Sequence, residues 1–307
     1  MYYDLKSFGA EVRNIRNNLE LTQSTVSELS DIHVDTIRKI ENGKVLPTQE
    51  TLDLLSPVLK KDLNALLLEH RLHDYHAFEE VKNRLESKLD KGEFETLSIE
   101  LEDLKALLDN TLHPYFINSI YQLILMTEAI IFRHKHEDPL TALNKLVDAM
   151  KVTTPDFTLD NYSDFVYNSM ELRILMNMAL MINELQSTDK SLEIMKYCIE
   201  SAKSAEPNDN IFPKICYNLS YTYHRLGRDK EALKYSNLGI DYCLKNRNYS
   251  GLNLLYFRRG IAEYFLKHDN YKDSLKKAVY FAEMLGHYEL RDLFISNCKK
   301  YYNIDIL

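Results

Sequence analysis

The sequence predicts an all-α protein in two parts: a compact N-terminal bundle of short helices, then a longer stack of helical hairpins. Glycine and proline number only 8 and 7 among 307 residues, too few for the tight turns of an all-β fold. Apolar residues recur at spacings of three and four, the period of a helix with one buried face. Small residues recur at nearly equal intervals in the C-terminal half, which indicates repeated hairpins.

The composition is that of a globular protein, with 45% hydrophobic and 27% charged residues. The longest apolar segment, residues 119–132, is too short to span a bilayer and contains Glu128. The N-terminus lacks the apolar core of an export signal, so we expect a cytoplasmic protein without a membrane partner. Lacking CxxC or zinc-ligand spacing, the four cysteines predict buried free thiols. They are Cys198, Cys216, Cys243 and Cys298.

The first sixty residues predict four short helices separated by tight turns. Thr22 can cap the second helix through its hydroxyl. Asp31 and Ile32 make the turn before the third helix, and Gly43 supplies the left-handed conformation after it. Pro47 precedes the fourth helix. The residues expected to face the core are Phe8, Val12, Ile15, Leu19, Val26, Leu29, Ile37, Ile40, Leu52, Leu55 and Leu59.

This segment resembles the Cro/repressor-type helix-turn-helix family from about Phe8 to Leu67. The string LTQSTVSELSDIHVDTIRKIENGKVLPTQETL carries the resemblance, with LTQ, the I-x-x-I-E-N-G tail and a following proline at the family's spacing. The resemblance implies a recognition helix over about 33–41 that enters the major groove of DNA. It implies that Gln23 holds a phosphate. The residues placed at the DNA are Gln23, Ser24, His33, Val34, Asp35, Thr36, Arg38 and Lys39.

The charge of this N-terminal domain, residues 1–67, departs from a typical DNA-binding surface. Eight Lys and Arg stand against ten Asp and Glu, and Asp35 lies on the expected DNA face. Nonspecific affinity should therefore be weak, and useful binding would need two copies on a two-fold symmetric site in double-stranded DNA. The alternative is that the fold serves as a protein-interaction module.

After a polar linker at residues 68–77, residues 78–307 predict about five helical hairpins and a C-terminal cap. The clearest unit matches the tetratricopeptide pattern, in which small residues let two antiparallel helices approach closely. The units are 78–108, 121–150, 177–198, 216–239 and 259–281, followed by the cap at 288–307. The corresponding small residues are Ala179 with Ser191, Ser220 with Ala232, and Ala262 with Ser274.

Stacked hairpins of this kind form a right-handed superhelix whose concave face is lined by the first helix of each pair. Amide and basic side chains along such a face suit an extended peptide with a free carboxylate. The expected peptide-binding residues are Arg173, Asn177, Asn183, Lys214, Asn218, Tyr221, His224, Arg225, Tyr256, Arg259 and Glu263. Met176, Leu180 and Tyr217 are further inward positions. For any single residue, a role in hairpin packing is the alternative.

A helix-turn-helix followed by such repeats resembles the RRNPP group of peptide-pheromone receptors of Gram-positive bacteria, over nearly the whole chain. The resemblance implies a homodimeric, sequence-specific transcription regulator controlled by a short signalling (quorum-sensing) peptide, with peptide binding and dimerisation in the repeat domain. The alternative is a regulator whose repeats hold a protein partner, as in an adaptor or antitoxin.

Catalytic chemistry has little support in the sequence. His134 and His136 are explained by a loop between helices, and His113 by the start of one. No spacing brings three metal ligands together, and there is no phosphate-binding loop or nucleophile motif. We therefore expect no catalytic residues, no metal and no cofactor.

Overall fold

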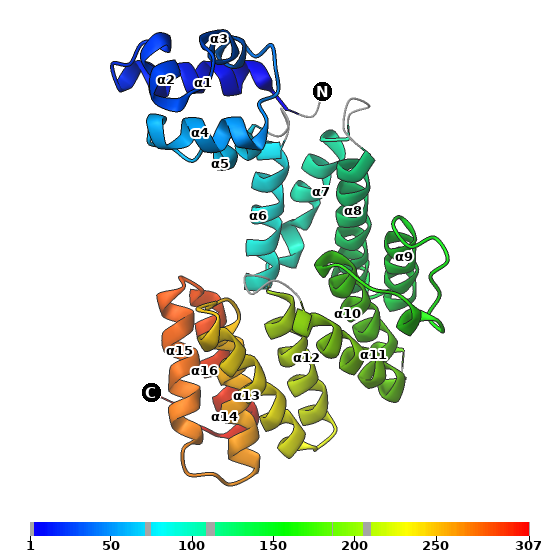
Figure 1. Cartoon of the computed structure of the whole chain (residues 1–307). Coiled ribbons are helices and arrows are strands. Elements are labelled where there is room, and N and C mark those ends of the chain that lie inside the picture. The colour runs from blue at the N-terminus through cyan, green and yellow to red at the C-terminus, as the bar shows by residue number, and fades with distance from the viewer. Residues whose placement is uncertain (1–2, 71–74, 109–113, 186, 205–209, 307) are drawn as a thin grey trace. The chain divides into compact units, whose positions relative to one another are not determined.

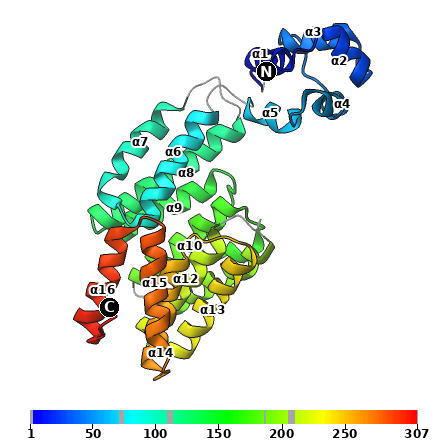
Figure 2. The same cartoon turned by 90° about the vertical axis from the view of Figure 1, so that its left-hand side faces the viewer.

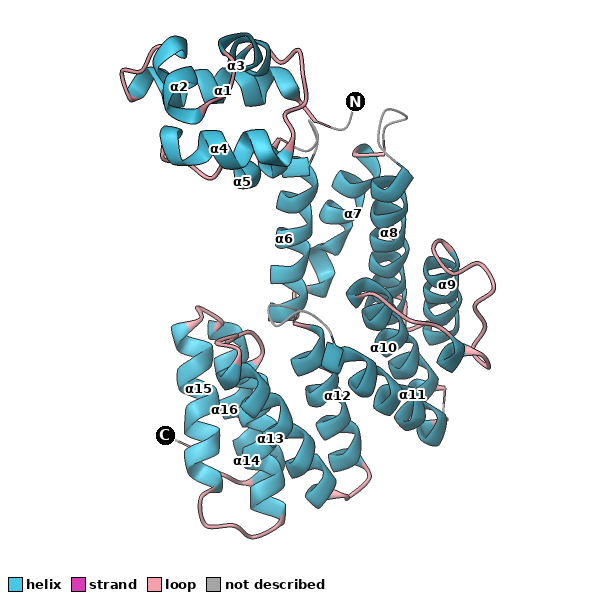
Figure 3. Ribbon diagram, in the orientation of Figure 1, coloured by secondary structure: helices cyan, strands magenta, loops and turns pink. Residues whose placement is uncertain are grey.

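The computed structural model describes residues 3–70, 75–108, 114–185, 187–204 and 210–306. Within these ranges the chain is helical and contains no strand (Figure 3), which confirms the predicted all-α fold. The chain divides into two compact units, residues 1–84 with 106–116, and residues 85–105 with 117–307. Of the predicted linker 68–77, residues 71–74 lie outside the described residues. Among the described helices, none combines the length and apolar character that crossing a bilayer needs.

The N-terminal unit begins with five helices whose starts are fixed by side-chain caps. Thr22 accepts a hydrogen bond from the backbone N–H of Thr25, as predicted, and Thr48 accepts one from Thr51. These caps satisfy N–H groups that have no partner inside the helix. The helices are α1 (Leu5–Asn18), α2 (Gln23–Ser30), α3 (Val34–Glu41), α4 (Gln49–Leu59) and α5 (Leu63–Glu69).

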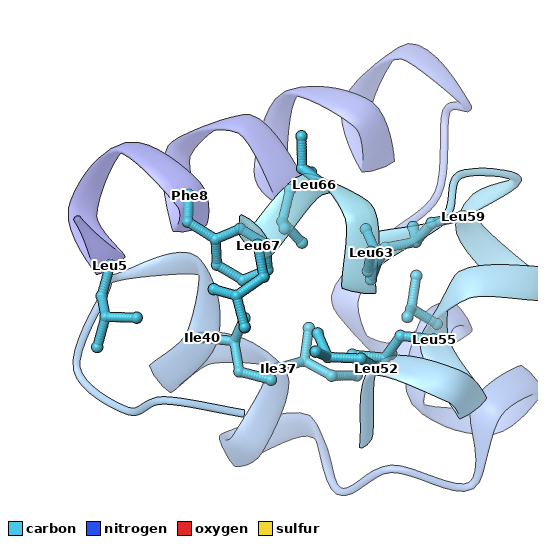
Figure 4. Close-up of a cluster of buried hydrophobic side chains, with 12 residues drawn as sticks. Leu5, Phe8, Ile37, Ile40, Leu52, Leu55, Leu59, Leu63, Leu66 and Leu67 are labelled. Atoms are coloured by element: carbon cyan, nitrogen blue, oxygen red, sulfur yellow. The ribbon is translucent and has the colours of Figure 1, made fainter. Parts of the chain in front are cut away.

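The core of this unit is aliphatic, with a single aromatic ring from Phe8 (Figure 4). Nine of the eleven residues expected to face inward are buried or partly buried against it. Leu29 was expected inward but is 63% exposed, because the eight-residue helix α2 turns only Val26 and Ser30 to the core. Leu19 is also exposed, since it caps the C-terminus of α1.

Two glycines hold α3 against α1. A Cβ on Gly9 would lie 2.3 Å from the carbonyl oxygen of Ile40, so the two backbones meet where only glycine fits. Gly43, at φ 64°, ends α3 in the predicted left-handed conformation, and its Cβ would strike Leu5. The position of α3 is therefore set by backbone contact with α1.

From α6 onward the helices follow one another in pairs (Figures 1 and 2), and from α9 to α16 each helix packs against the next. Five pairs are followed by a single helix. Pairs one to three are α6 (Tyr75–Lys91) with α7 (Leu97–Ala106), α8 (Pro114–Lys135) with α9 (Pro139–Lys151), and α10 (Ser169–Glu184) with α11 (Thr188–Ser201). The rest are α12 (Ile211–Arg225) with α13 (Asp229–Lys245), α14 (Leu252–Phe265) with α15 (Tyr271–Met284), and α16 (Tyr288–Tyr302). Short 3₁₀ turns lie at Phe94–Thr96, Tyr162–Asp164 and Ala202–Ser204.

In the last three pairs, the small residues that the repeat pattern predicts at the helix contacts are buried. Ser220 on α12 donates a hydrogen bond to the carbonyl oxygen of Ala232 on α13, at 2.8 Å. A Cβ on Gly239 would lie 2.7 Å from the Leu255 side chain, so α13 and α14 also meet closely. The four cysteines are free and buried, as predicted.

A long ordered connection between α9 and α10, residues 152–168, was not predicted from the sequence. Residues 152–168 return over the hairpins, with the Phe157 ring fully buried and the Tyr162 hydroxyl bound to Glu193 on α11, at 2.7 Å. Its end caps α10: Asn168 and Glu171 each bond the other's backbone N–H. This fixes the start of α10, whose next turn carries Arg173.

Candidate functional site

The first candidate site is the outer face of α2 and α3. All eight residues predicted there are at least partly accessible. Ser24, His33, Arg38 and Lys39 are exposed, while Gln23, Val34, Asp35 and Thr36 are half-buried. His33 caps α3 by accepting a hydrogen bond from the backbone N–H of Asp35. Short polar groups at the start of a projecting helix are suited to contact base edges in a major groove.

Glu41, at the end of α3, links three helices beneath this face. Its buried carboxylate accepts hydrogen bonds from Arg16 on α1, at 2.5 and 3.0 Å, and from the Gln23 amide on α2, at 2.7 Å. Arg13 lies 3.4 Å away. Burial alone would raise the pKa of Glu41, but these hydrogen bonds and charges together hold it below its ordinary value. The bond uses one amide N–H of Gln23, which leaves the other for a phosphate.

Charge on the face itself is partly cancelled. The guanidinium of Arg38 lies 2.6 Å from the carboxylate of Asp35, one turn earlier on α3, and both side chains are half-exposed or more. An exposed pair of this kind is weak and open to exchange for another partner. Arg38 could therefore leave Asp35 and bind a phosphate or a base edge, while the negative charge of Asp35 stays close by.

The second candidate site is a cavity of about 200 Å³ in the C-terminal unit, lined by first helices of the hairpins. Seven inward positions predicted from the sequence line it: Arg173, Met176, Asn177, Leu180, Lys214, Tyr217 and Asn218. The lining residues that sequence reasoning missed are Leu89, Asp90, Phe94, Ile130, Arg133, His134, Pro213, Ser250, Gly251, Asn253, Leu254 and His287. The mixture of apolar surface with a few polar groups is typical of ligand sites.

Carboxylates already neutralise the cations of this cavity. Arg173 makes a bidentate ion pair with Glu86 on α6. Lys214 lies 3.1 Å from both Glu86 and Asp90. Arg133 on α8 pairs with Glu184, at 2.5 Å. Although cationic side chains surround the cavity, its lining carries little net positive charge.

Two asparagines present acceptors along the cavity. Asn177 and Asn218 each donate from the amide nitrogen to the carbonyl oxygen four residues earlier, at 2.9 and 3.0 Å. That bond turns each amide back along its own helix and holds its rotamer. Within the described ranges, their Oδ1 atoms accept no hydrogen bond, so both can receive N–H groups of an extended backbone.

Two histidines of the lining have pKa values below the ordinary range. The His134 ring stacks on Phe94, with centroids 3.8 Å apart, and burial and the neighbouring Arg133 charge lower its pKa to about 4. His287, beside Asn253, also has a lowered pKa, mainly through burial. His134 belongs to the last turn of α8, and not to the loop expected from the sequence.

The other predicted peptide-binding residues lie outside the cavity lining. Tyr256 and Glu263 are buried inside the hairpin: the Tyr256 ring stacks on Phe281, and Glu263 binds Arg259 and Ser274. On α14 the residues that line the cavity are Asn253 and Leu254, which the repeat frame did not select. The remainder are Asn183, Tyr221, His224 and Arg225; of these, His224 pairs with Asp229, at 2.7 Å.

What sequence reasoning missed comes mainly from elements far apart in the chain. Asp90, for example, reaches Lys214 across more than a hundred residues, and His287 follows α15. The one available signal was that α6 and α8, as first helices of hairpins, should also turn a face inward. In the described part of the chain, no group of three His, Cys, Asp or Glu residues could hold a metal ion.

Two family models match the sequence. Residues 12–66 match a helix-turn-helix model, and residues 152–303 match the RNPP family C-terminal domain. The second range includes α10, α12 and α14, which line the cavity. No curated protein matches the chain.

Solved structures similar to this one share its fold across almost the whole chain. PlcR of Bacillus thuringiensis, in complex with the peptide PapR7 and DNA, is 18% identical over 94% of this chain and 99% of its own, with a TM-score of 0.73. ComR of S. thermophilus, in complex with DNA and its signalling peptide ComS, is 14% identical over 94% and 97%, with a TM-score of 0.60. The SHP pheromone receptor Rgg2 of Streptococcus dysgalactiae is 13% identical over 96% and 99%, with a TM-score of 0.55.

Proposed function

We propose that this chain, whose residues 152–303 match the RNPP family C-terminal domain, is a DNA-binding transcription regulator controlled by a short signalling peptide. The observation that carries the proposal is the union, in one chain, of a helix-turn-helix with the RNPP C-terminal domain that holds the cavity. The helix-turn-helix beside this C-terminal domain supports a role in transcription and not in catalysis.

The DNA-reading surface is the outer face of α2 and α3. Arg38 and Lys39 supply its positive charge, His33 to Thr36 face the bases, and Gln23 with Ser24 holds the backbone. The domain is slightly acidic, so one copy gains little from phosphate attraction. A homodimer on a two-fold symmetric operator, acting in the cytoplasm, supplies the missing affinity.

The peptide site is the cavity between α10, α12 and α14. Apolar side chains such as Met176 and Leu254 take side chains of the peptide, while Asn177 and Asn218 pair with its backbone. The solved structures of PlcR and ComR each hold both a peptide and DNA, which supports the same pair of ligands here. Peptide acts on DNA binding only if it prefers one arrangement of the protein over another.

A mobility-shift assay tests both halves of the proposal. The full chain is titrated onto the DNA upstream of its own gene at low salt, with and without synthetic peptides encoded by neighbouring short reading frames. We expect a shifted band whose affinity changes with one peptide. Arg38→Ala should weaken binding about tenfold or more. The matched control Lys61→Ala, an exposed charge of the same domain beyond α4, should not.

The two halves fail in different ways. Absence of a shift at low salt under every peptide condition contradicts DNA reading. A shift that no peptide alters contradicts control through the cavity and favours a protein partner.

A further inference from the structure

The cations that line the cavity are already paired, which limits how the cavity could bind an anionic ligand. The three cations of the lining, Arg133, Arg173 and Lys214, each have a carboxylate partner within hydrogen-bond distance. A free carboxylate on a ligand would have to displace one of those partners. An anionic ligand therefore needs a cation that this protein has not already paired.

Arg258, on α14 one turn after Leu254, is such a cation. Its guanidinium lies over the rings of Tyr217 and Tyr221, at 5.1 and 4.5 Å from their centroids, and it donates to the Tyr217 hydroxyl at 3.1 Å. Tyr217 itself lines the cavity. Arg258 has no ion pair with any residue that the structure describes, and its buried Nε–H has no acceptor there.

A half-buried guanidinium without a carboxylate partner is energetically unfavourable. Half-burial removes part of its hydration, which is unfavourable for a charge without a counter-ion. The faces of Tyr217 and Tyr221 compensate in part through cation–π attraction. A carboxylate would complete the compensation, because the planar guanidinium offers two parallel N–H groups to its oxygens.

A second arginine without a carboxylate partner among the described residues lies on α12, one helical turn after Tyr221. This residue, Arg225, is exposed at the end of the helix. Burial raises the pKa of Tyr302, while the charges of Arg258 and Arg225 both oppose that rise. Tyr221, whose ring lies under the Arg258 guanidinium, supplies a further hydrogen-bond donor there.

We infer that Arg258 binds a carboxylate of the peptide ligand at the end of the cavity marked by Tyr217. The inference rests on the proposed peptide site and names its specificity: the site selects anionic peptides, with the charge at one end. The carboxylate is either the peptide's C-terminus or an acidic side chain. The backbone of the peptide then runs from Tyr217 toward Asn218 and Asn177.

The probe is an equimolar library of random heptapeptides with free C-termini, selected on the full-length protein and identified by mass spectrometry. The peptide bound best is resynthesised in three forms: the free acid, the C-terminal amide, and the acid with any Asp or Glu replaced by Asn or Gln. Calorimetry gives the affinity of each form for the wild type and for variants.

We expect one neutralised form of the peptide to lose about tenfold or more in affinity for the wild type, the range for a charge-assisted hydrogen bond. The form that loses identifies the source of the carboxylate. In Arg258→Gln the difference should fall below about threefold. In the matched control Arg228→Gln it should persist, since Arg228 is an exposed arginine outside the cavity lining that pairs with Glu231.

Three results overturn the inference. If all three forms bind equally well, no carboxylate is read. If the difference survives Arg258→Gln but disappears in Arg173→Gln or Lys214→Gln, the ligand displaces the carboxylates of α6 instead. If no peptide binds at all, the proposed peptide site fails with it. Melting curves check folding, and should Arg258→Gln unfold, Arg258→Lys replaces it, with a reduced carboxylate preference expected because lysine lacks the guanidinium fork.

Discussion

Glu86 on α6 and Arg173 on α10 form a bidentate ion pair, although 87 residues separate them in the sequence. Glu86 also contacts Lys214, so one carboxylate holds two cations of the cavity. Glu86→Gln should destabilise the C-terminal unit by about 2 kcal/mol, since it leaves a largely buried Arg173 without its partner. Urea denaturation measures the loss, and amide exchange over residues 85–91 should become faster.

Glu79→Gln, on the same helix, is the matched control for this prediction. Glu79 pairs with Lys82 one turn away, at 3.3 Å, in a more exposed position. Its loss should change stability by less than about 0.5 kcal/mol. Equal effects of the two substitutions would show that Glu86 acts through helix propensity and not through Arg173.

Glu41 should be the most sensitive charged residue of the N-terminal unit. Glu41→Gln should destabilise it by about 3 kcal/mol, because Arg16 then keeps a partly buried charge without a carboxylate. The pKa of Glu41 is lowered in the folded protein, so its contribution is present above the ordinary value of 4.5 and is lost as the pH falls further. Thermal melts of wild type and variant should therefore converge in acid.

Glu50→Gln, at an exposed position in the first turn of α4, serves as the control for Glu41. It should leave the melting temperature nearly unchanged at every pH. A difference between wild type and Glu41→Gln that persists undiminished at low pH would contradict the ionic origin of the effect.

The helices of the N-terminal domain could be predicted from the sequence because their caps and turns depend on residues close together in the chain. Thr22 caps the next helix through atoms three residues away, and Gly43 adopts a conformation that few other residues tolerate. Leu29 shows the limit. Over eight residues, a helix offers too few turns for spacing to decide which apolar residue faces the core.

The residues that line the cavity could be predicted only in part. On α10 and α12 the repeat pattern fixed the frame, and Arg173, Asn177, Lys214 and Asn218 line the cavity. On α14 the pattern is degenerate: it selected Tyr256, which is buried in the hairpin, whereas Asn253 and Leu254 line the cavity. Contacts such as Lys214 with Asp90 depend on tertiary packing, which no spacing along the chain records.

Asp35 should limit the affinity of the helix-turn-helix for DNA. Asp35→Asn removes a negative charge from the face of α3 and frees Arg38 from its ion pair. Nonspecific binding should strengthen, and the slope of log K against log salt should steepen by about one as Arg38 engages a phosphate. Fluorescence anisotropy over a salt series measures both. Glu28→Gln, an exposed charge on α2, should alter affinity less; equal effects would indicate net charge alone.

His134 should make the stability of the C-terminal unit depend on pH. Its pKa is about 4 in the folded protein, against an ordinary 6.5, so between these values the unfolded chain binds a proton that the folded one does not. Stability should fall as the pH drops from about 7 toward 4. His134→Gln should flatten that dependence by about 1 kcal/mol, a value kept small because solvent reaches the ring.

An NMR titration of the His134 ring protons tests the same point directly. Phe94→Leu removes the ring that covers His134 and should move its pKa back toward 6.5, while leaving the neighbouring Arg133 and its partner Glu184 in place. The pKa of His287 shifts in the same direction, so the contribution of His134 to the pH dependence of stability is isolated by comparing variants in a His287→Gln background. If His134 titrates near 6.5 in the folded wild type, the stacked arrangement with Phe94 does not hold the ring away from protons.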